Sequence, residues 1–272
     1  MVKKFNLVLN LIVIIFIAAG CVTQNKKFTE ADYEKVEKEI EIGRAVFAKL
    51  AGKYGVIKDE KSTEYLNKFG KSLAMFTERQ EIEYYFAVLK SDQVNAYALP
   101  GGYVLISLGA LKQIKSPGEL AGIIAHELGH INKKHVLKRV KIQTKFNFFE
   151  TLARFIAGPR QIVTTVVNQV SQKVEEVLFI KGYDAADEYE ADAYAVTLLT
   201  NMQINSSEYI RLLVRLKTQT KKEELENLDA THPDIQERIN RMMPLIDSKL
   251  SKLKDTEKFK EFMTFINGDN AL

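Results

Sequence analysis

The sequence predicts an α+β fold that is mainly α-helical and carries one small antiparallel β-sheet. Apolar residues recur at helical spacing over most of the chain. Residues 82–107 differ, because they are rich in β-branched and aromatic side chains and contain the turn sequence Pro100-Gly101-Gly102. The signature "AHELGH" follows in a segment with a helical start. No internal repeat and no linker rich in proline and glycine occurs, so residues 29–272 are expected to form a single domain.

The composition is that of a globular protein rather than a disordered or collagen-like one, with 46% hydrophobic and 27% charged residues. The formal net charge of +4 includes Lys3 and Lys4, which belong to a predicted leader. The rest of the chain is therefore only slightly basic. Because no dense basic stripe with interleaved aromatic residues occurs, nucleic acid is not an expected partner.

The N-terminus has the layout of a bacterial secretory leader. Two lysines precede an apolar run from Phe5 to Ala19, and Ala18-Ala19-Gly20-Cys21 resembles a lipobox, where lipoproteins are cleaved before an acylated cysteine. The run is shorter than the roughly 20 residues of a bilayer-spanning helix. We therefore predict a signal peptide over residues 1–20 and a lipidated tether over residues 21–28, with an uncleaved anchor helix as the alternative.

Cys21 is the only cysteine in the chain, so no internal disulfide can form. Its position at the end of the leader favours lipidation, which would hold the protein on a membrane surface. Val22 follows it where, by resemblance to enterobacterial sorting, an aspartate favours retention at the inner membrane. We expect a lipid-anchored protein on the periplasmic side of a bacterial membrane, with the outer membrane preferred.

Two amphipathic helices are expected before the β-rich segment. Thr29 is a candidate N-cap for the first, at Glu30 to Leu50, and the second covers about Ser62 to Phe76. The Pro-Gly-Gly turn joins the last two of three expected strands. These strands lie at about Ile82–Leu89, Asn95–Ala98 and Tyr103–Ser107.

The helix that carries "AHELGH" has a strong start signal, with Ser116 as N-cap and Pro117 at the first helical position. We expect it to continue through "ELAGIIAHELGHINKKHVLKRV". Segment Lys141–Tyr183 is apolar only in parts, which favours a pair of amphipathic helices that pack on the body or cover a groove. Further helices are expected at about Asp184–Thr200, Ser206–Thr218 and Pro233–Leu250.

His126 and His130 bracket an H-E-x-x-H arrangement. Helical spacing places both imidazoles on one face, where they can bind a single ion. Glu127 lies about 100° round the helix, close enough to contact a water on that ion. In this arrangement the metal lowers the pKa of the water and the glutamate takes its proton. The motif predicts one Zn2+ per chain with Glu127 as general base.

A catalytic zinc needs a third protein ligand. His135 lies five residues beyond His130 and is rotated away from it on a continuous helix, so a surface or capping histidine is expected. "DEYEADAYA" offers Glu188 and Asp192 four residues apart on one face, whereas Glu190 points elsewhere. Zinc could satisfy Glu188, and a histidine N–H could satisfy Asp192. The alternative is a solvated acidic helix start that favours the helix dipole.

In combination, these motifs resemble the gluzincin metalloproteases that include HtpX, the BepA-type periplasmic proteases and the CaaX prenyl protease. The resemblance extends from about residue 40 to 245 and includes "NAYALPGGYVLISLGAL" and "THPDIQERI". It implies a zincin-like metalloprotease domain in which Glu127 is the base and Asp192 supports a ligand. The zinc ligands that it implies are His126, His130 and Glu188.

The same resemblance brings His232 and Arg238 into the active site. His232 has two possible jobs, as an oxyanion donor or as a fourth zinc ligand that keeps the resting enzyme latent. Arg238 could stabilise the same oxyanion or pair with an acidic neighbour. The strand at Tyr103–Ser107 could be ordinary core sheet and also an exposed edge to which a peptide substrate adds, since the two roles are not exclusive. The residues assigned to substrate binding on it are Tyr103, Val104 and Leu105.

The chain differs from HtpX and the CaaX protease, because no spanning helix is expected after the leader, and from BepA-type proteins, because no C-terminal helical-repeat domain is expected. The closest likeness is to short, lipid-anchored members of the family. We expect a zinc endopeptidase in protein quality control that cleaves misfolded or unassembled envelope proteins. Two alternatives are a largely latent, zinc-bound chaperone-like assembly factor and a structural lipoprotein with a fortuitous motif.

Overall fold

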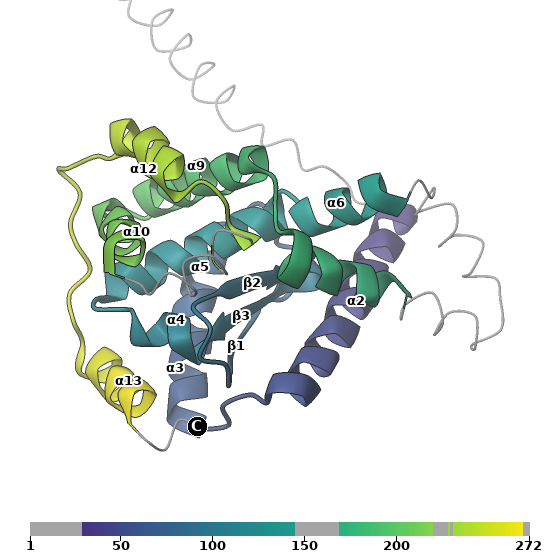
Figure 1. Cartoon of the computed structure of the whole chain (residues 1–272), viewed down its shortest axis with the longest axis horizontal. Helices are drawn as coiled ribbons and strands as arrows, with labels where there is room; N and C mark the ends of the chain where they lie inside the picture. Colours follow the sequence, from purple (N-terminus) through teal and green to yellow (C-terminus); the bar gives the residue numbers. More distant parts are fainter. Residues whose placement is uncertain (1–28, 145–168, 220–227, 229–230, 269–272) are drawn as a thin grey trace, which may run out of the picture. The chain divides into compact units, whose positions relative to one another are not determined.

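The computed structural model describes residues 29–144, 169–219, 228 and 231–268 (Figure 1). The described residues from Val36 onward belong to one compact unit. The predicted leader, the tether with Cys21 and residues 145–168 of the uncertain segment lie outside the described residues. Among the described helices, none combines the length and the apolar character that crossing a membrane requires.

Most of the described chain is helical. The helices are α2 (Glu30–Tyr54), α3 (Glu60–Ala74), α4 (Leu108–Lys112), α5 (Pro117–Asn132), α6 (His135–Thr144), α9 (Ala185–Asn201), α10 (Ser207–Gln219), α12 (Ile235–Met242) and α13 (Glu257–Asn267). Residues 169–176 are also helical and run into a π-helical turn, Val177–Lys181. The predicted mainly helical α+β class is confirmed.

The sheet has three strands, β1 (Tyr85–Leu89), β2 (Ala96–Leu99) and β3 (Tyr103–Ser107), in the order β1-β3-β2. β2 and β3 form the expected antiparallel hairpin around Pro100–Gly102. Gly102 has φ +96°, and a Cβ there would lie 2.2 Å from the carbonyl oxygen of Glu83, so only glycine fits the turn.

The prediction of a wholly antiparallel sheet is wrong, because β1 pairs with β3 in parallel. All five residues of β3 are buried, and this strand takes the central position. The chain runs from β1 at one edge to β2 at the other and then returns between them, which makes β1 and β3 parallel. The expectation that β3 is an exposed edge is wrong for the same reason, while the assignment of Tyr103, Val104 and Leu105 to substrate binding stays a prediction. Both sides of β3 are already hydrogen-bonded to neighbouring strands, which leaves β1 and β2 as the edges.

The sheet separates two apolar cores, because successive side chains of a strand point to opposite faces. Val104 and Ile106 of β3 belong to the core that includes α3, α5, α9 and α10. Tyr103 and Leu105 point into the other core, with α2, α6 and helical residues 169–178. Figure 1 shows α2 on one side of the strands and α5 on the other. The helix that carries the motif is therefore held against the sheet.

Two helix boundaries differ from the predictions. The start of α5 is as expected, since the Ser116 side chain accepts a hydrogen bond from the Glu119 amide. Its end is not, because α5 stops at Asn132 and Lys134 has φ +57°, a left-handed conformation that interrupts the helix before α6. α12 is also shorter than expected, because Pro244 has no amide hydrogen with which to continue it.

Candidate metal centre

Four buried residues bring their ligand atoms within 4.8 Å of one another: His126, His130, Glu188 and His232, called here the four-residue cluster. α5 supplies the first two, α9 the third, and the segment before α12 the fourth. The Nε2 atoms of the two α5 histidines lie 3.0 Å apart, and Nε2 of His130 lies 3.2 Å from Oε1 of Glu188. Nδ1 of His232 lies 3.0 Å from the same oxygen.

Close packing of α5 against α9 places Glu188 between the histidines. A Cβ on Gly129 would lie 3.0 Å from the carbonyl oxygen of Ala191, so glycine permits this approach. His232 is held through its neighbour Thr231, whose hydroxyl accepts a hydrogen bond from the Asn95 amide at 3.0 Å. The cluster is thus assembled from segments far apart in sequence by helix packing and by contact with the sheet.

The cluster has the chemistry of a zinc site. Histidine nitrogens and a carboxylate oxygen are preferred Zn2+ ligands. Lone-pair atoms this close together repel one another unless a proton or a cation lies between them. Glu127 adds a second sign of an unmet interaction, since its buried Oε2 has no hydrogen-bond partner among the described residues. The side chains of this site therefore fit a zinc ion.

Burial also sets the protonation of the site. It raises the pKa of Glu127 and lowers the pKa of His130 well below its usual value. Burial and the Arg238 charge would lower the pKa of His126, but the Glu188 and Asp192 carboxylates beside it outweigh them and raise it to about 9. His126 thus carries a second proton near neutral pH when no metal is bound.

Asp192 orients one member of the cluster, His126, through a hydrogen bond. Nδ1 of His126 donates to Oδ1 of Asp192 at 2.9 Å, which turns Nε2 of that ring toward the other ligands. The guanidinium of Arg238 donates to both Asp192 oxygens at 2.7 and 2.8 Å and pairs with Glu188 at 2.8 Å. Burial alone would raise the pKa of Asp192, but Arg238 holds it at about 2. Of the two jobs considered for Arg238, pairing with acidic neighbours is the one seen in the structure.

Tyr209 and Tyr183 complete the surroundings, and the sequence reasoning missed both. The Tyr209 hydroxyl donates to Asp192 at 3.2 Å and accepts from Arg238 at 2.8 Å. The Tyr183 ring stacks on His130 with ring centroids 3.9 Å apart. Neither tyrosine lies in a recognisable motif, so no local signal in the sequence identifies them.

The sequence predicts that His135 is a surface or capping histidine. The surface position is wrong, because the His135 side chain is fully buried. Its Nδ1 lies 2.8 Å from Nδ1 of His130, and its Nε2 lies 3.1 Å from Oε2 of Glu190. The interruption at Lys134 explains the difference. A continuous helix would carry His135 away from His130, whereas the start of a new helix turns it back. All four histidines of the chain are therefore buried around one site.

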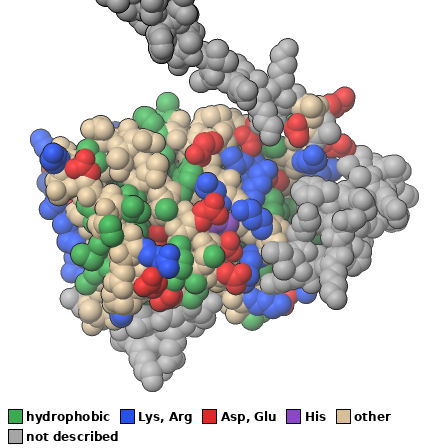
Figure 2. Space-filling model, turned by 90° about the horizontal axis from the view of Figure 1, so that it is seen from above, with side chains coloured by type: hydrophobic (Ala, Val, Ile, Leu, Met, Phe, Trp, Pro, Cys, Tyr) green, Lys and Arg blue, Asp and Glu red, His purple; other side chains and the backbone are tan. Residues whose placement is uncertain are grey.

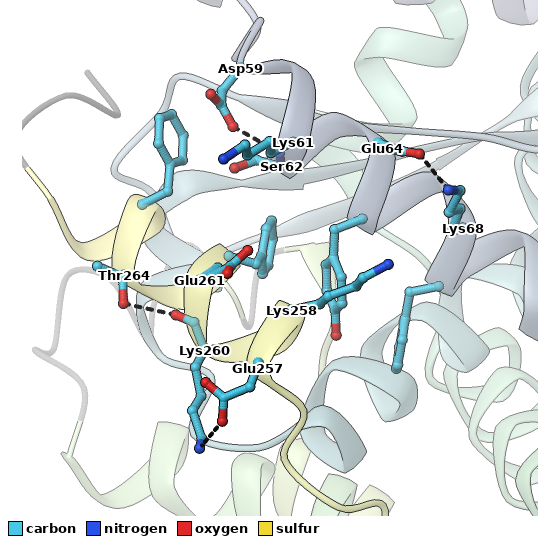
Figure 3. A pocket seen from close by; sticks show the side chains of 14 residues that line it. Asp59, Lys61, Ser62, Glu64, Lys68, Glu257, Lys258, Lys260, Glu261 and Thr264 are labelled. Atoms are coloured by element: carbon cyan, nitrogen blue, oxygen red, sulfur yellow. Dashed lines mark hydrogen bonds and ion pairs between the residues drawn. The ribbon is translucent and has the colours of Figure 1, made fainter.

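The surface above the site shows little of this arrangement. On the face in Figure 2, acidic and basic side chains are intermixed and only a trace of histidine reaches the surface. A cavity of about 50 Å3 touches His126, Glu127 and His232 and is otherwise lined mainly by apolar side chains of α10 and its neighbours. A larger cavity of about 1010 Å3 lies between α3 and α13 (Figure 3), where charged residues such as Glu64 and Lys260 surround it and no histidine lines it.

Comparison with known proteins agrees with the geometry. The chain is 20% identical over 225 residues to the beta-barrel assembly-enhancing protease of Escherichia coli strain K12, which covers 78% of this chain and 46% of that protein. It is 28% identical over 147 residues to the mitochondrial metalloendopeptidase OMA1 of Arabidopsis thaliana, covering 54% of this chain and 28% of the relative. The matched part thus spans less than half the length of these relatives. Residues 60–245, more than half of the chain, match the profile described as "Peptidase family M48". The chain belongs to this metallopeptidase family.

Proposed function

We propose that the protein is a zinc-dependent endopeptidase that hydrolyses peptide bonds of misfolded or unassembled envelope proteins. The observation that carries this proposal is the convergence of His126, His130 and Glu188. Beside them lies Oε2 of Glu127, which has no hydrogen-bond partner within the described part of the chain. The family assignment supports a metalloprotease. The choice of zinc rests on the nature of the ligands.

A zinc ion at this position would polarise the scissile carbonyl and lower the pKa of an attacking water. Oε2 of Glu127 accepts the proton of that water and then passes it to the leaving amine. Burial raises the pKa of this carboxyl, which brings it closer to the working pH and favours both transfers. Asp192 and Arg238 keep the His126 ring oriented throughout, because both are buried and hydrogen-bonded.

We propose that His232 occupies the fourth ligand position in the resting protein. Its Nδ1 lies 3.0 and 3.1 Å from the two oxygens of Glu188, inside the four-residue cluster. In this position it keeps the site latent until a substrate displaces it. The same closeness supports the second candidate function, a largely latent, zinc-bound assembly factor with chaperone-like action, in which His232 never leaves.

The envelope setting of the proposal rests on two further observations. The predicted leader, residues 1–20, ends just before Cys21, which we propose is lipidated and holds the protein on the periplasmic side of the outer membrane. The Escherichia coli relative is named for enhancing β-barrel assembly. Unassembled envelope polypeptides are therefore the substrate class that we propose for this chain.

Metal analysis of the full-length chain tests the zinc site. We expect one zinc per chain in the wild type and a loss of zinc affinity in Glu188→Ala that exceeds the roughly 10- to 100-fold effect of outer-shell changes. Glu237→Ala, on an exposed turn of α12, is the matched control and is expected to keep its zinc. Zinc content that is indifferent to Glu188 would show that the ligand assignment is wrong.

Zinc binding is also expected to release about one proton from the protein at pH 7. The pKa of His126 is about 9 without metal, and a ligand must be deprotonated before it binds. The apparent zinc affinity should therefore rise with pH and level off near pH 9. Calorimetric titrations in buffers of different ionisation enthalpy count the released protons, and no release at pH 7 would contradict the assigned protonation.

A further inference from the structure

We propose that His135 and Glu190 are positioning residues that keep the proton of His130 on Nδ1 and so direct its Nε2 lone pair at the metal. The inference rests on the proposed zinc site. It assigns a task to the fourth histidine, which the H-E-x-x-H motif does not use. The side chains of Glu190, His135 and His130 are called here the histidine relay.

The histidine relay is a continuous hydrogen-bonded path from the surface to the four-residue cluster. Oε2 of Glu190 lies 3.1 Å from Nε2 of His135, and Nδ1 of His135 lies 2.8 Å from Nδ1 of His130. Nε2 of His130 then lies 3.2 Å from Oε1 of Glu188. The His135 side chain lies between Glu190 and His130 and is fully buried, and both of its ring nitrogens have a hydrogen-bond partner on these residues.

Glu190, at the surface end of the relay, determines which nitrogen donates in each of these hydrogen bonds. An ionised carboxylate only accepts hydrogen bonds, so Nε2 of His135 must donate to Glu190. A neutral imidazole that donates through Nε2 has Nδ1 free to accept, and the proton between the two rings therefore belongs to His130. The Nε2 of His130 is left as a lone pair, which is the form that binds a metal.

The opposite direction is disfavoured by charge. It would turn the lone pair of His135 Nε2 toward Glu190 and also toward Oδ1 of Asp187, which lies 3.7 Å away. Lys133 and Lys138 pair with Glu190 at 3.5 and 3.9 Å and favour its ionised form. Two carboxylates and two ammonium groups thus hold the relay in one direction.

Without the relay, His130 has a competing tautomer. When the His126 ring is neutral, Nε2 of His130 could carry the proton and donate it to Oε1 of Glu188, which is 3.2 Å away, or to Nε2 of His126, which is 3.0 Å away. Zinc would then have to displace that proton and force a change of tautomer before it could bind. Pre-selection of the correct tautomer should therefore strengthen zinc binding, by roughly the 10- to 100-fold that outer-shell partners contribute.

The tautomer itself is measurable, because the chain has only four histidines. Long-range 15N NMR of the full-length, zinc-free chain, selectively labelled at histidine and measured above pH 9, should show His130 protonated at Nδ1. Above this pH the His126 ring is neutral and cannot donate a hydrogen bond to Nε2 of His130, which lies 3.0 Å away. His135→Asn keeps an acceptor oxygen in place of Nδ1 and should retain this signature. His135→Leu has similar bulk but no acceptor, and a mixture of tautomers is expected for His130.

Zinc affinity, measured by competition with a chromophoric chelator, gives the second readout. His135→Leu should bind zinc about 10- to 100-fold more weakly, whereas His135→Asn should stay within a few-fold of the wild type. Glu190→Gln should weaken binding by a smaller factor, because Asp187 remains. Lys71→Gln removes an exposed ion pair with Glu83 and changes no residue that contacts the relay, so it serves as the unchanged control.

A second variant keeps the test possible if the first one does not fold. Should His135→Leu fail to fold, Glu190→Gln still tests the relay, since the Glu190 side chain is 45% exposed. An unchanged His130 tautomer in His135→Leu, or equal zinc affinity in His135→Leu and His135→Asn, would overturn the proposal. A wild-type chain that binds no zinc would instead overturn the proposed function, while the NMR measurement would still decide the direction of the relay.

Discussion

Replacement of Glu127 by glutamine is expected to slow peptide hydrolysis by about 100- to 10,000-fold while zinc stays bound. The amide has nearly the same shape as the carboxylate but cannot accept a proton. Glu127 lies beside the proposed metal ligands, and its buried Oε2 has no hydrogen-bond partner in the part of the chain that the structure describes. The measurement is the cleavage rate of an unfolded envelope protein, with zinc content determined on the same samples.

The control for this experiment is Glu237→Gln, which makes the same chemical change on the exposed side of α12 and should leave the rate unchanged. The same pair distinguishes the two candidate functions. A protease loses its effect on envelope proteins in Glu127→Gln, whereas a chaperone-like factor keeps it. Undiminished hydrolysis in Glu127→Gln would show that another group takes the proton.

Removal of the Arg238 charge should have the largest effect on folding. We expect Arg238→Met to lower the free energy of unfolding of the zinc-free chain by about 3–5 kcal/mol, because two buried carboxylates are then offset only by the single charge of His126. Those carboxylates are Glu188 and Asp192, both at most 2% exposed. Denaturant-induced unfolding of both proteins gives the difference.

Arg241→Met is the matched control, since it makes the same replacement in the same helix. The Arg241 side chain is 57% exposed, pairs with Glu237 and lies over the Tyr189 ring. Its loss should cost no more than about 1 kcal/mol. Equal costs at the two positions would mean that the buried ion pairs contribute nothing to stability beyond an exposed pair.

The sequence alone determined the features that depend on local periodicity and capping. Ser116 and Pro117 begin α5, and the four-residue spacing of His126 and His130 puts both on one side of it. The same spacing separates Glu188, which joins the four-residue cluster, from Asp192, which supports it. These relations are reliable because helix geometry connects residues three or four positions apart.

The tertiary structure decided what depends on contacts between distant segments. Only the packed chain shows that β3 is the central strand, because its backbone is paired with β1 on one side and with β2 on the other. Only the packed chain brings Tyr209 of α10 to Asp192 of α9 and turns His135 back to His130 after a left-handed residue. The helix rule failed at His135 because it assumes an unbroken helix. The motif spacing therefore predicted which side chains could hold a metal, and the packing of α5, α9 and α12 decided which groups orient them.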